Sequence, residues 1–332
     1  LGFAFEEATN LRTINTVNAP ISTNFAGAWK SCSSLTQFPS GAKLGTEASN
    51  VNFTSAWQQS GLTSFPSLDL SSGTIFNSSW YYCTGLIAFP SMQLTSATNL
   101  NGSWMGCSSL ETFGRLEAPN ATVFTSTWRN CTSLQSFPES ALLGTDVSSA
   151  NFEGAWRNSG LTSFSTPLPT ATNIRSTWED CSSLISFNSQ LPLAGNLLFA
   201  WDGCSSLTSF DVPLPSAYSM YRAWAGCSSL TDFSVDVFSN WNPTIIQSGV
   251  FDFAWLSCSS LTAQSVENIL VGISNSGKWA TTNGLQGGTA LADATIDIDY
   301  NVATGSLTAA TLTAIETLNG RGWSVNINGV IQ

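Results

Sequence analysis

The sequence is poor in charge and contains no histidine. Only 9% of its 332 residues are charged, and 21 acidic against 10 basic side chains give a formal net charge of −11. Without histidine, neither Ser-His nor Cys-His activation of a nucleophile is available. The lack of a Lys/Arg cluster excludes the basic surface that nucleic acids and anionic membranes require. We therefore expect no enzymatic activity, no cofactor and no nucleic-acid partner.

A pair of carboxylates, as in glycosidases, is the catalytic chemistry that remains, but Asp and Glu do not recur at any repeat position. Asp180, Asp202 and Asp232 fall near expected turns, and solvated surface is the favoured interpretation. No Cys-x-x-Cys pair exists, which disfavours a zinc site. We expect no metal site, with calcium between acidic turns as the alternative left open.

Long hydrophobic runs are also missing. No apolar run approaches the roughly 18 residues of a membrane-spanning helix, so we expect no membrane span. The chain begins at Leu1, and we expect a processed or truncated chain whose signal or anchor precedes this residue. Ser, Thr and Asn are abundant, together with 13 Trp and 20 Phe. The surface should therefore be wetted by hydroxyls and amides rather than by charge.

Tryptophan recurs at intervals that range from 22 residues (Trp156 to Trp178) to 31 residues (Trp224 to Trp255). A registered period in this range is typical of a solenoid, in which each repeat stacks on its neighbours. Phe5 is the anchor of a degenerate first copy, which gives about eleven repeats. The anchor tryptophans are Trp29, Trp57, Trp80, Trp104, Trp128, Trp156, Trp178, Trp201, Trp224 and Trp255.

The positions around each anchor repeat as well. A small residue precedes it, an apolar residue lies four positions before it, and a Leu and usually a Phe follow. Ser60 and Ser159 stand three positions after the anchor in the two copies that follow long spacers. In most other copies this place is taken by a cysteine: Cys32, Cys83, Cys107, Cys131, Cys181, Cys204, Cys227 and Cys258. These registered positions predict one shared core that contains both the anchor column and the cysteine column.

The tryptophan column has two interpretations. Exposed aromatic side chains in a row recognise sugar faces, whereas a small residue beside each Trp makes room for it in a core. We favour the core. Trp241 lies in the longest spacer, outside the register, and is therefore the candidate for an exposed ligand contact.

The cysteine column also has two interpretations. In successive coils the Cα atoms would lie roughly 5 Å apart, which is close enough for disulfides. Ser60 and Ser159 interrupt the column and would leave some cysteines without a partner. Because a buried thiol behaves as a small hydrophobe that Ser can replace, we favour reduced thiols.

The repeats predict a solenoid over residues 1–262, with a short parallel strand and one helical or 3-10 turn in each coil. The segment SLTSFPS is typical of such a strand, which its proline ends. Residues 263–332 leave the pattern and predict a small α/β capping unit of helix, strand, helix and strand. The first of these helices should have Ser265 as its N-cap and an inward face of Ile269, Leu270 and Ile273.

The order aromatic-x-x-Cys-x-x-Leu, followed by Phe, is seen at Trp104, Cys107, Leu110 and Phe113. It resembles the BspA-like leucine-rich repeat of roughly 25 residues, and the resemblance covers residues 1–262. The resemblance implies a secreted or surface-displayed bacterial or viral protein that acts in adhesion or host recognition. The chain departs from the family with Trp where Phe is more common and with Phe-Pro at the strand end, which leaves the ligand unspecified.

From these features we expect a non-enzymatic extracellular recognition module, on a cell surface or on a virion as a phage host-attachment protein. Its ligand would be a surface glycan or protein, because an uncharged exterior suits binding in salt, where ion pairs are screened beyond about 10 Å. The alternative is a structural building block of a fibre, sheath or virion decoration, held by self-association or by other virion or surface proteins. Binding residues should lie where the sequence does not repeat: the long spacers, the strand face and the C-terminal unit.

Overall fold

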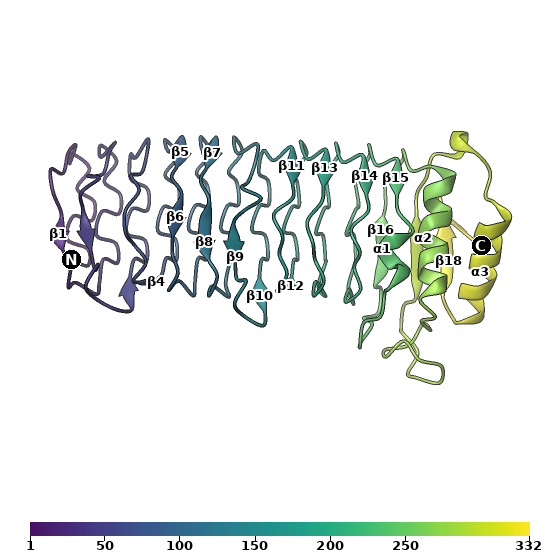
Figure 1. Ribbon diagram of the computed structural model, residues 1–332. Helices are drawn as coiled ribbons and strands as arrows, with labels where there is room; N and C mark the ends of the chain where they lie inside the picture. Colours follow the sequence, from purple (N-terminus) through teal and green to yellow (C-terminus); the bar gives the residue numbers. More distant parts are fainter. The chain divides into compact units, whose positions relative to one another are not determined.

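The computed structural model describes residues 1–332, apart from the side chain of Thr304. The chain forms two compact units, Leu1–Leu161 and Thr162–Gln332. Each unit contains a stack of short coils, and the second also carries an α/β region (Figure 1). The predicted fold class, a leucine-rich-repeat-like solenoid with a small α/β region at its C-terminal end, is confirmed.

Short parallel strands join neighbouring coils of the first unit. Equivalent repeat positions face each other, so that Phe89 pairs with Phe113 and Gln93 pairs with Glu117. The strands are β1 (Asn18–Ala19), β2 (Lys43–Leu44), β3 (Val51–Asn52), β4 (Gly73–Ile75), β5 (Ala88–Phe89), β6 (Met92–Gln93), β7 (Thr112–Phe113), β8 (Leu116–Ala118), β9 (Leu142–Leu143) and β10 (Ala150–Asn151).

The second unit continues the same plan and then changes. Strands β11 and β13 pair in parallel, as do β14 and β15, and β16 to β19 form a four-stranded sheet on which only β19 is antiparallel to its neighbour. The elements are β11 (Ser163–Phe164), β12 (Ala171–Asn173), β13 (Ser186–Phe187), β14 (Ser209–Phe210), β15 (Asp232–Phe233), α1 (Asp236–Ser239), β16 (Phe251–Trp255), α2 (Ala263–Asn275), β17 (Thr295–Ile298), η1 (Val302–Thr304), α3 (Ala309–Gly320), β18 (Ser324–Ile327) and β19 (Val330–Ile331).

Each coil turns around its anchor through two left-handed residues, one two positions before the anchor and one two positions after it. Around Trp80 these are Ser78 and Tyr82, with φ angles of 56° and 54°. The amides of Ser78, Trp80 and Tyr82 donate to carbonyls of the next coil, each at 2.8 Å. An Asn often starts the turn, since its side-chain oxygen accepts from the amide two residues later, as Asn99 does from Asn101 at 2.9 Å. We call the surface formed from three residues before to two residues after each anchor the turn face.

The anchor tryptophans are fully buried, with 0% exposure. Trp104 stacks between Trp80 and Trp128, with ring centroids 5.0 Å and 5.7 Å away. Phe89 and Phe113 meet it edge to face at 4.9 Å and 5.0 Å. The second unit repeats this arrangement with its own anchors. A coil of this length cannot enclose a core alone, and the aromatic stack is the core that neighbouring coils share.

The cysteines are buried free thiols that bind the neighbouring coil through hydrogen bonds. Cys107 Sγ donates to the carbonyl of Trp80 at 3.1 Å. The same bond recurs in both units at 3.0–3.2 Å. Where the column is interrupted, Ser60 Oγ lies 3.3 Å from Cys83 Sγ. Serine therefore occupies the cysteine place with its hydroxyl in the same column.

Trp241 lies in the core, so the expectation that it forms an exposed contact is wrong. Its side chain is 1% exposed, and its indole Nε1 donates to the carbonyl of Ala217 at 2.6 Å. The long spacer contains the short helix α1, which brings Phe238 alongside Trp241, and the Trp241 ring packs 5.2 Å from Phe251. The extra residues of this spacer thus add buried side chains to the core, although the spacer also has exposed residues such as Asn240 and Ile245.

The N-cap of α2 is Thr262, whose hydroxyl accepts from the amide of Ser265 at 3.2 Å. Ser265 is buried inside the first turn and donates to the carbonyl of Thr231 at 2.9 Å. The prediction of Ser265 as N-cap is therefore wrong, because a second hydroxyl residue three positions earlier takes that role. The predicted inward face is confirmed, since Ile269, Leu270 and Ile273 are buried. Within the described part of the chain, every helix is too short or too polar to cross a membrane.

Candidate functional site

An open groove of about 670 Å³ crosses three neighbouring coils of the first unit. Its lining comes from residues 67–71, 91–93 and 115–117, which include β6 and part of β8. These segments follow the anchors Trp57, Trp80 and Trp104, from each of which the next anchor is 23 or 24 residues away. The coils on either side have 28-residue intervals. The groove therefore coincides with the run of short coils between two long ones.

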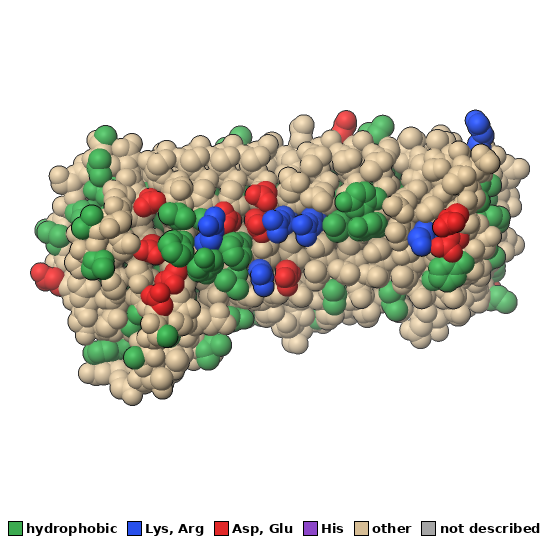
Figure 2. All heavy atoms as spheres, turned by 180° about the vertical axis from the view of Figure 1, so that it is seen from behind, with side chains coloured by type: hydrophobic (Ala, Val, Ile, Leu, Met, Phe, Trp, Pro, Cys, Tyr) green, Lys and Arg blue, Asp and Glu red, His purple; other side chains and the backbone are tan. Residues whose placement is uncertain are grey.

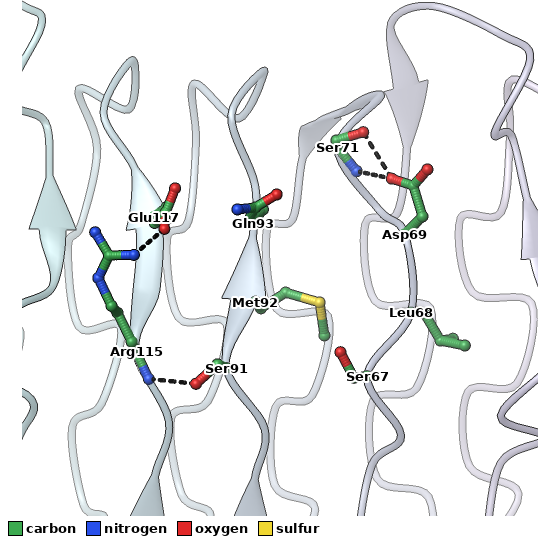
Figure 3. Close-up of a pocket in the computed structure, with 9 residues that line it drawn as sticks. All are labelled: Ser67, Leu68, Asp69, Ser71, Ser91, Met92, Gln93, Arg115 and Glu117. Atoms are coloured by element: carbon green, nitrogen blue, oxygen red, sulfur yellow. Dashed lines mark hydrogen bonds and ion pairs between the residues drawn. The ribbon is translucent and has the colours of Figure 1, made fainter.

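Three polar side chains hold equivalent places along the groove. Asp69, Gln93 and Glu117 follow one another at intervals of 24 residues, and Gln93 pairs in register with Glu117. In Figure 3 they lie in a row across adjacent coils. Leu68 and Met92 are buried beside them, at 8% and 3% exposure. The groove thus combines a polar row with an apolar floor.

Hydrogen bonds fix the two ends of this row. Asp69 Oδ1 accepts from the hydroxyl of Ser71 at 2.6 Å and from its amide at 3.1 Å. At the other end the Arg115 guanidinium forms an ion pair with Glu117 (Figure 3). The Nε of Arg115 also donates to the carbonyl of Ser140 at 3.0 Å. Because these side chains are held before a ligand arrives, binding loses less conformational entropy.

The groove is built for hydrogen bonding. A carboxylate, an amide and a second carboxylate offer acceptors at regular intervals, and Gln93 and Arg115 add donors. The Arg115–Glu117 pair is solvent-accessible, with side-chain exposures of 43% and 19%, so it adds little to stability and is available to a ligand. An extended polar molecule that crosses several coils, such as a glycan or a peptide, matches this arrangement.

The turn face is a second surface on which charged and hydrophobic side chains gather. In each unit, charged and hydrophobic groups gather there in a narrow band, while most of the remaining surface on this side is neither (Figure 2). In the second unit Arg222 Nε donates to Asp202 at 2.8 Å. Beside this pair, Tyr221 contacts Phe199 and Phe253 edge to face, with centroid distances of 5.5 Å and 5.8 Å.

The structure does not bring the acidic residues near the expected turns together as a metal site. Asp202 is paired with Arg222, and Asp232 lies in β15. Among the residues that the structure describes, no group of three or more Cys, Asp or Glu side chains is placed to hold a metal ion.

The groove residues were not predicted from the sequence. The anchor tryptophans, the cysteines and Trp241 all lie in the core and none lines the groove. A signal for the groove was nonetheless present, because Asp69, Gln93 and Glu117 share one repeat position in three successive copies. This signal is weaker than that of the core, because the buried columns repeat in almost every copy whereas this polar position is shared by three successive copies.

Comparison with known proteins yields only distant likenesses. No protein-family model matches the sequence. No curated protein matches it either. A leucine-rich repeat protein from Bacteroides ovatus has a similar structure, with 14% identity, coverage of 79% of this chain and 80% of that one, and a TM-score of 0.30. A leucine-rich repeat protein from Eubacterium ventriosum is 11% identical, with coverage of 60% and 78% and a TM-score of 0.23.

Proposed function

We propose that this chain is a non-enzymatic extracellular recognition module that binds a surface glycan or protein in the groove of its first unit. It would act in adhesion or host recognition, on a cell surface or on a virion, as the resemblance to BspA-like repeats implies. The observation that carries the proposal is the in-register row of Asp69, Gln93 and Glu117 over an apolar floor.

Two properties of the groove support binding over catalysis. Asp69 and Glu117 are each engaged by a fixed neighbour, Ser71 and Arg115 respectively, which suits recognition by hydrogen bonds. The groove is also open and can admit a chain that continues beyond it, whereas catalysis on a bond favours an enclosed site that excludes water. A ligand that spans several coils gains contacts from each of them.

The proposal is tested by binding of the purified full chain to arrays of glycans and of extracellular-matrix proteins. A triple variant, Asp69→Asn with Gln93→Ala and Glu117→Gln, should lose at least about 1.4 kcal/mol of binding free energy, which is a tenfold loss of affinity. The matched control is Glu111→Gln, which neutralises an exposed carboxylate outside the groove and should bind as the unchanged protein does. Equal binding by the triple variant and the control would refute the assignment of the ligand to the groove.

A further inference from the structure

The turn face of the first unit contains a surface whose composition differs from the rest of the band. In the coils anchored at Trp57, Trp80 and Trp104, every side chain on this face is uncharged. Lys30 and Arg129, in the coils on either side, are the nearest charged positions of the band. We call this surface the tyrosine patch, and its accessible side chains include Gln58, Gln59, Asn77, Tyr81, Tyr82 and Asn101.

Two tyrosine rings form the centre of the patch. Tyr81 and Tyr82 have ring centroids 4.6 Å apart, and Tyr82 is 39% exposed. The Tyr82 ring lies against the backbone of the next coil, since a Cβ atom added at Gly106 would come within 2.8 Å of two of its ring atoms. Tyr81 similarly lies near Gly102, with 3.9 Å to the added Cβ. The missing side chain at Gly106 thus gives the Tyr82 ring room to lie against the next coil, and the residue remains partly exposed to solvent.

Tyr82 occupies this place at a conformational cost. Its φ angle is +54°, in the left-handed region that large L-residues rarely adopt. The same repeat position is glycine at Gly106, Gly203 and Gly226. Holding a non-glycine residue there costs about 1–2 kcal/mol. The other non-glycine residues at this repeat position are small or polar, among them Ser31, Gln59 and Asn130, so what distinguishes Tyr82 is the large aromatic ring that it places on this face.

We infer that the tyrosine patch binds an uncharged carbohydrate chain, with a sugar ring against the exposed part of the Tyr82 ring. The negative face of an aromatic ring attracts the polarised C–H groups of a sugar. The sugar hydroxyls would hydrogen-bond the neighbouring side-chain amides. Asn101 Nδ2 donates to Asn77 Oδ1 at 2.8 Å, so the Nδ2 donors of Asn77 and the Oδ1 acceptor of Asn101 can bond the sugar. The absence of charge over three coils matches a polyhydroxylated neutral ligand and gives no anchor for an ionic one.

The repeat itself fits a chain of sugars. Coils joined by parallel strands are spaced by about 4.8 Å, which is close to the length of one sugar ring. Successive sugars can therefore meet successive coils, with Tyr82 in one and Met105 in the next. This surface lies on the turn face and shares no residue with the groove, so the inference goes beyond the proposed function.

The probe is an array of neutral hexose and N-acetylhexosamine oligosaccharides, with acidic oligosaccharides included, read with the full chain. Tyr82→Gly removes the ring and relieves the left-handed backbone. We expect an unchanged or higher Tm together with a loss of neutral-glycan binding of about tenfold or more. Tyr82→Phe keeps the ring face and should bind within about threefold of the unchanged protein. A tyrosine with a purely structural role would instead give a lower Tm on removal of its ring.

A matched pair of glycine variants tests the room that Gly106 gives the ring. Gly106→Ala would displace the Tyr82 ring and should weaken binding. Gly226→Ala is the control: its φ of +72° is close to the +76° of Gly106, but an added Cβ meets nothing nearer than 3.5 Å. Both variants should lose stability from the left-handed backbone, Gly106→Ala should lose more because the ring must move, and only Gly106→Ala should lose glycan binding.

Three outcomes would overturn the inference: a blank array beside a positive-control lectin, binding of acidic glycans alone, or undiminished binding by Tyr82→Gly. The triple groove variant must retain the neutral-glycan signal of the patch. Because the two surfaces are changed separately, failure of this inference leaves the test of the groove intact.

Discussion

Replacement of Trp104 by alanine is the most direct test of the shared aromatic core. The side chain is 0% exposed and touches four rings, Trp80, Trp128, Phe89 and Phe113, at centroid distances of 4.9–5.7 Å. Burial of a tryptophan removes about 150–250 Å² from water. At about 25 cal/mol per Å² this corresponds to about 4–6 kcal/mol, in line with the about 3–5 kcal/mol measured for aromatic-to-alanine changes in cores. We expect Trp104→Ala to lower the free energy of unfolding by about 4–5 kcal/mol.

The assay is urea unfolding followed by circular dichroism, since the other tryptophans complicate fluorescence. Coils contact only their neighbours, so the loss should also broaden or split the transition. The control is Ile87→Ala in the coil that precedes the Trp104 anchor, where the side chain is 49% exposed and the change should stay within about 0.5 kcal/mol. If Trp104→Ala does not fold, Trp104→Phe gives a smaller loss of about 1–2 kcal/mol that can still be measured. A loss below about 1 kcal/mol for Trp104→Ala would refute the buried stack.

Three further predictions concern titration and capping. Burial raises the pKa of the Cys83 thiol to about 11 from 9.0, so the folded state favours the protonated thiol. The free energy of unfolding should therefore be unchanged below about pH 9 and fall between about pH 9 and 11. Urea midpoints at pH 8 and 10.5 measure this fall, which should be smaller in Cys83→Ser. Burial, and then the neighbouring Asp293, raise the pKa of Asp252 to about 7 from 3.8. The stability that the protein gains from protonated Asp252 is fully present below about pH 3.8 and is lost as the pH rises through about 7. The Tm should therefore fall between pH 5 and 8, and Asp252→Asn should flatten that profile. A Tm profile of Asp252→Asn with the same slope would contradict this. Thr262→Ala removes the N-cap of α2 and should lower the free energy of unfolding by about 1 kcal/mol, whereas Thr262→Ser should be near neutral in the same urea titration.

Much of the scaffold follows from the sequence because the repeat constrains the same atoms many times. The spacing of Trp104, Cys107, Leu110 and Phe113 is reproduced in copy after copy, and all four side chains are buried. A single copy would give only an ambiguous apolar pattern. Registered copies identify the core columns, since residues that stack on one another must fit the same space.

The left-handed residues on either side of each anchor were missed, although the sequence held a signal for them. Gly27, Gly102 and Gly154 stand two positions before their anchors, and other copies have Ser there. Phe199 and Arg222 obscure the pattern because they adopt the same conformation with large side chains. A propensity rule fails at such positions, since hydrogen bonds to the next coil override the local preference.

The roles of Trp241 and Ser265 could not be predicted from neighbouring residues, because both depend on tertiary contacts. The environment of Trp241 depends on how its spacer folds back through α1, and no periodicity describes that spacer. Thr262 and Ser265 are both acceptable N-caps, and the choice between them is made by tertiary contacts, since Ser265 is needed to hydrogen-bond the strand segment at Thr231. The groove forms because short coils lie between two longer ones. The repeat lengths alone do not predict it, since they produce a groove only when the coils are stacked.

In each coil, the left-handed residues direct one set of side chains to the surface, while a different set forms the core. Anchor and cysteine columns carry the packing, while the residue two positions after the anchor ranges from Gly106 to Tyr82, Asn130 and Asp180 with the same backbone. A change there costs a bounded amount of backbone energy and no cavity. The side chains on this face can therefore differ from coil to coil while the buried columns stay the same. The solenoid core is therefore independent of the side chains at these surface positions, and the binding specificity of the turn face can change while the fold stays the same.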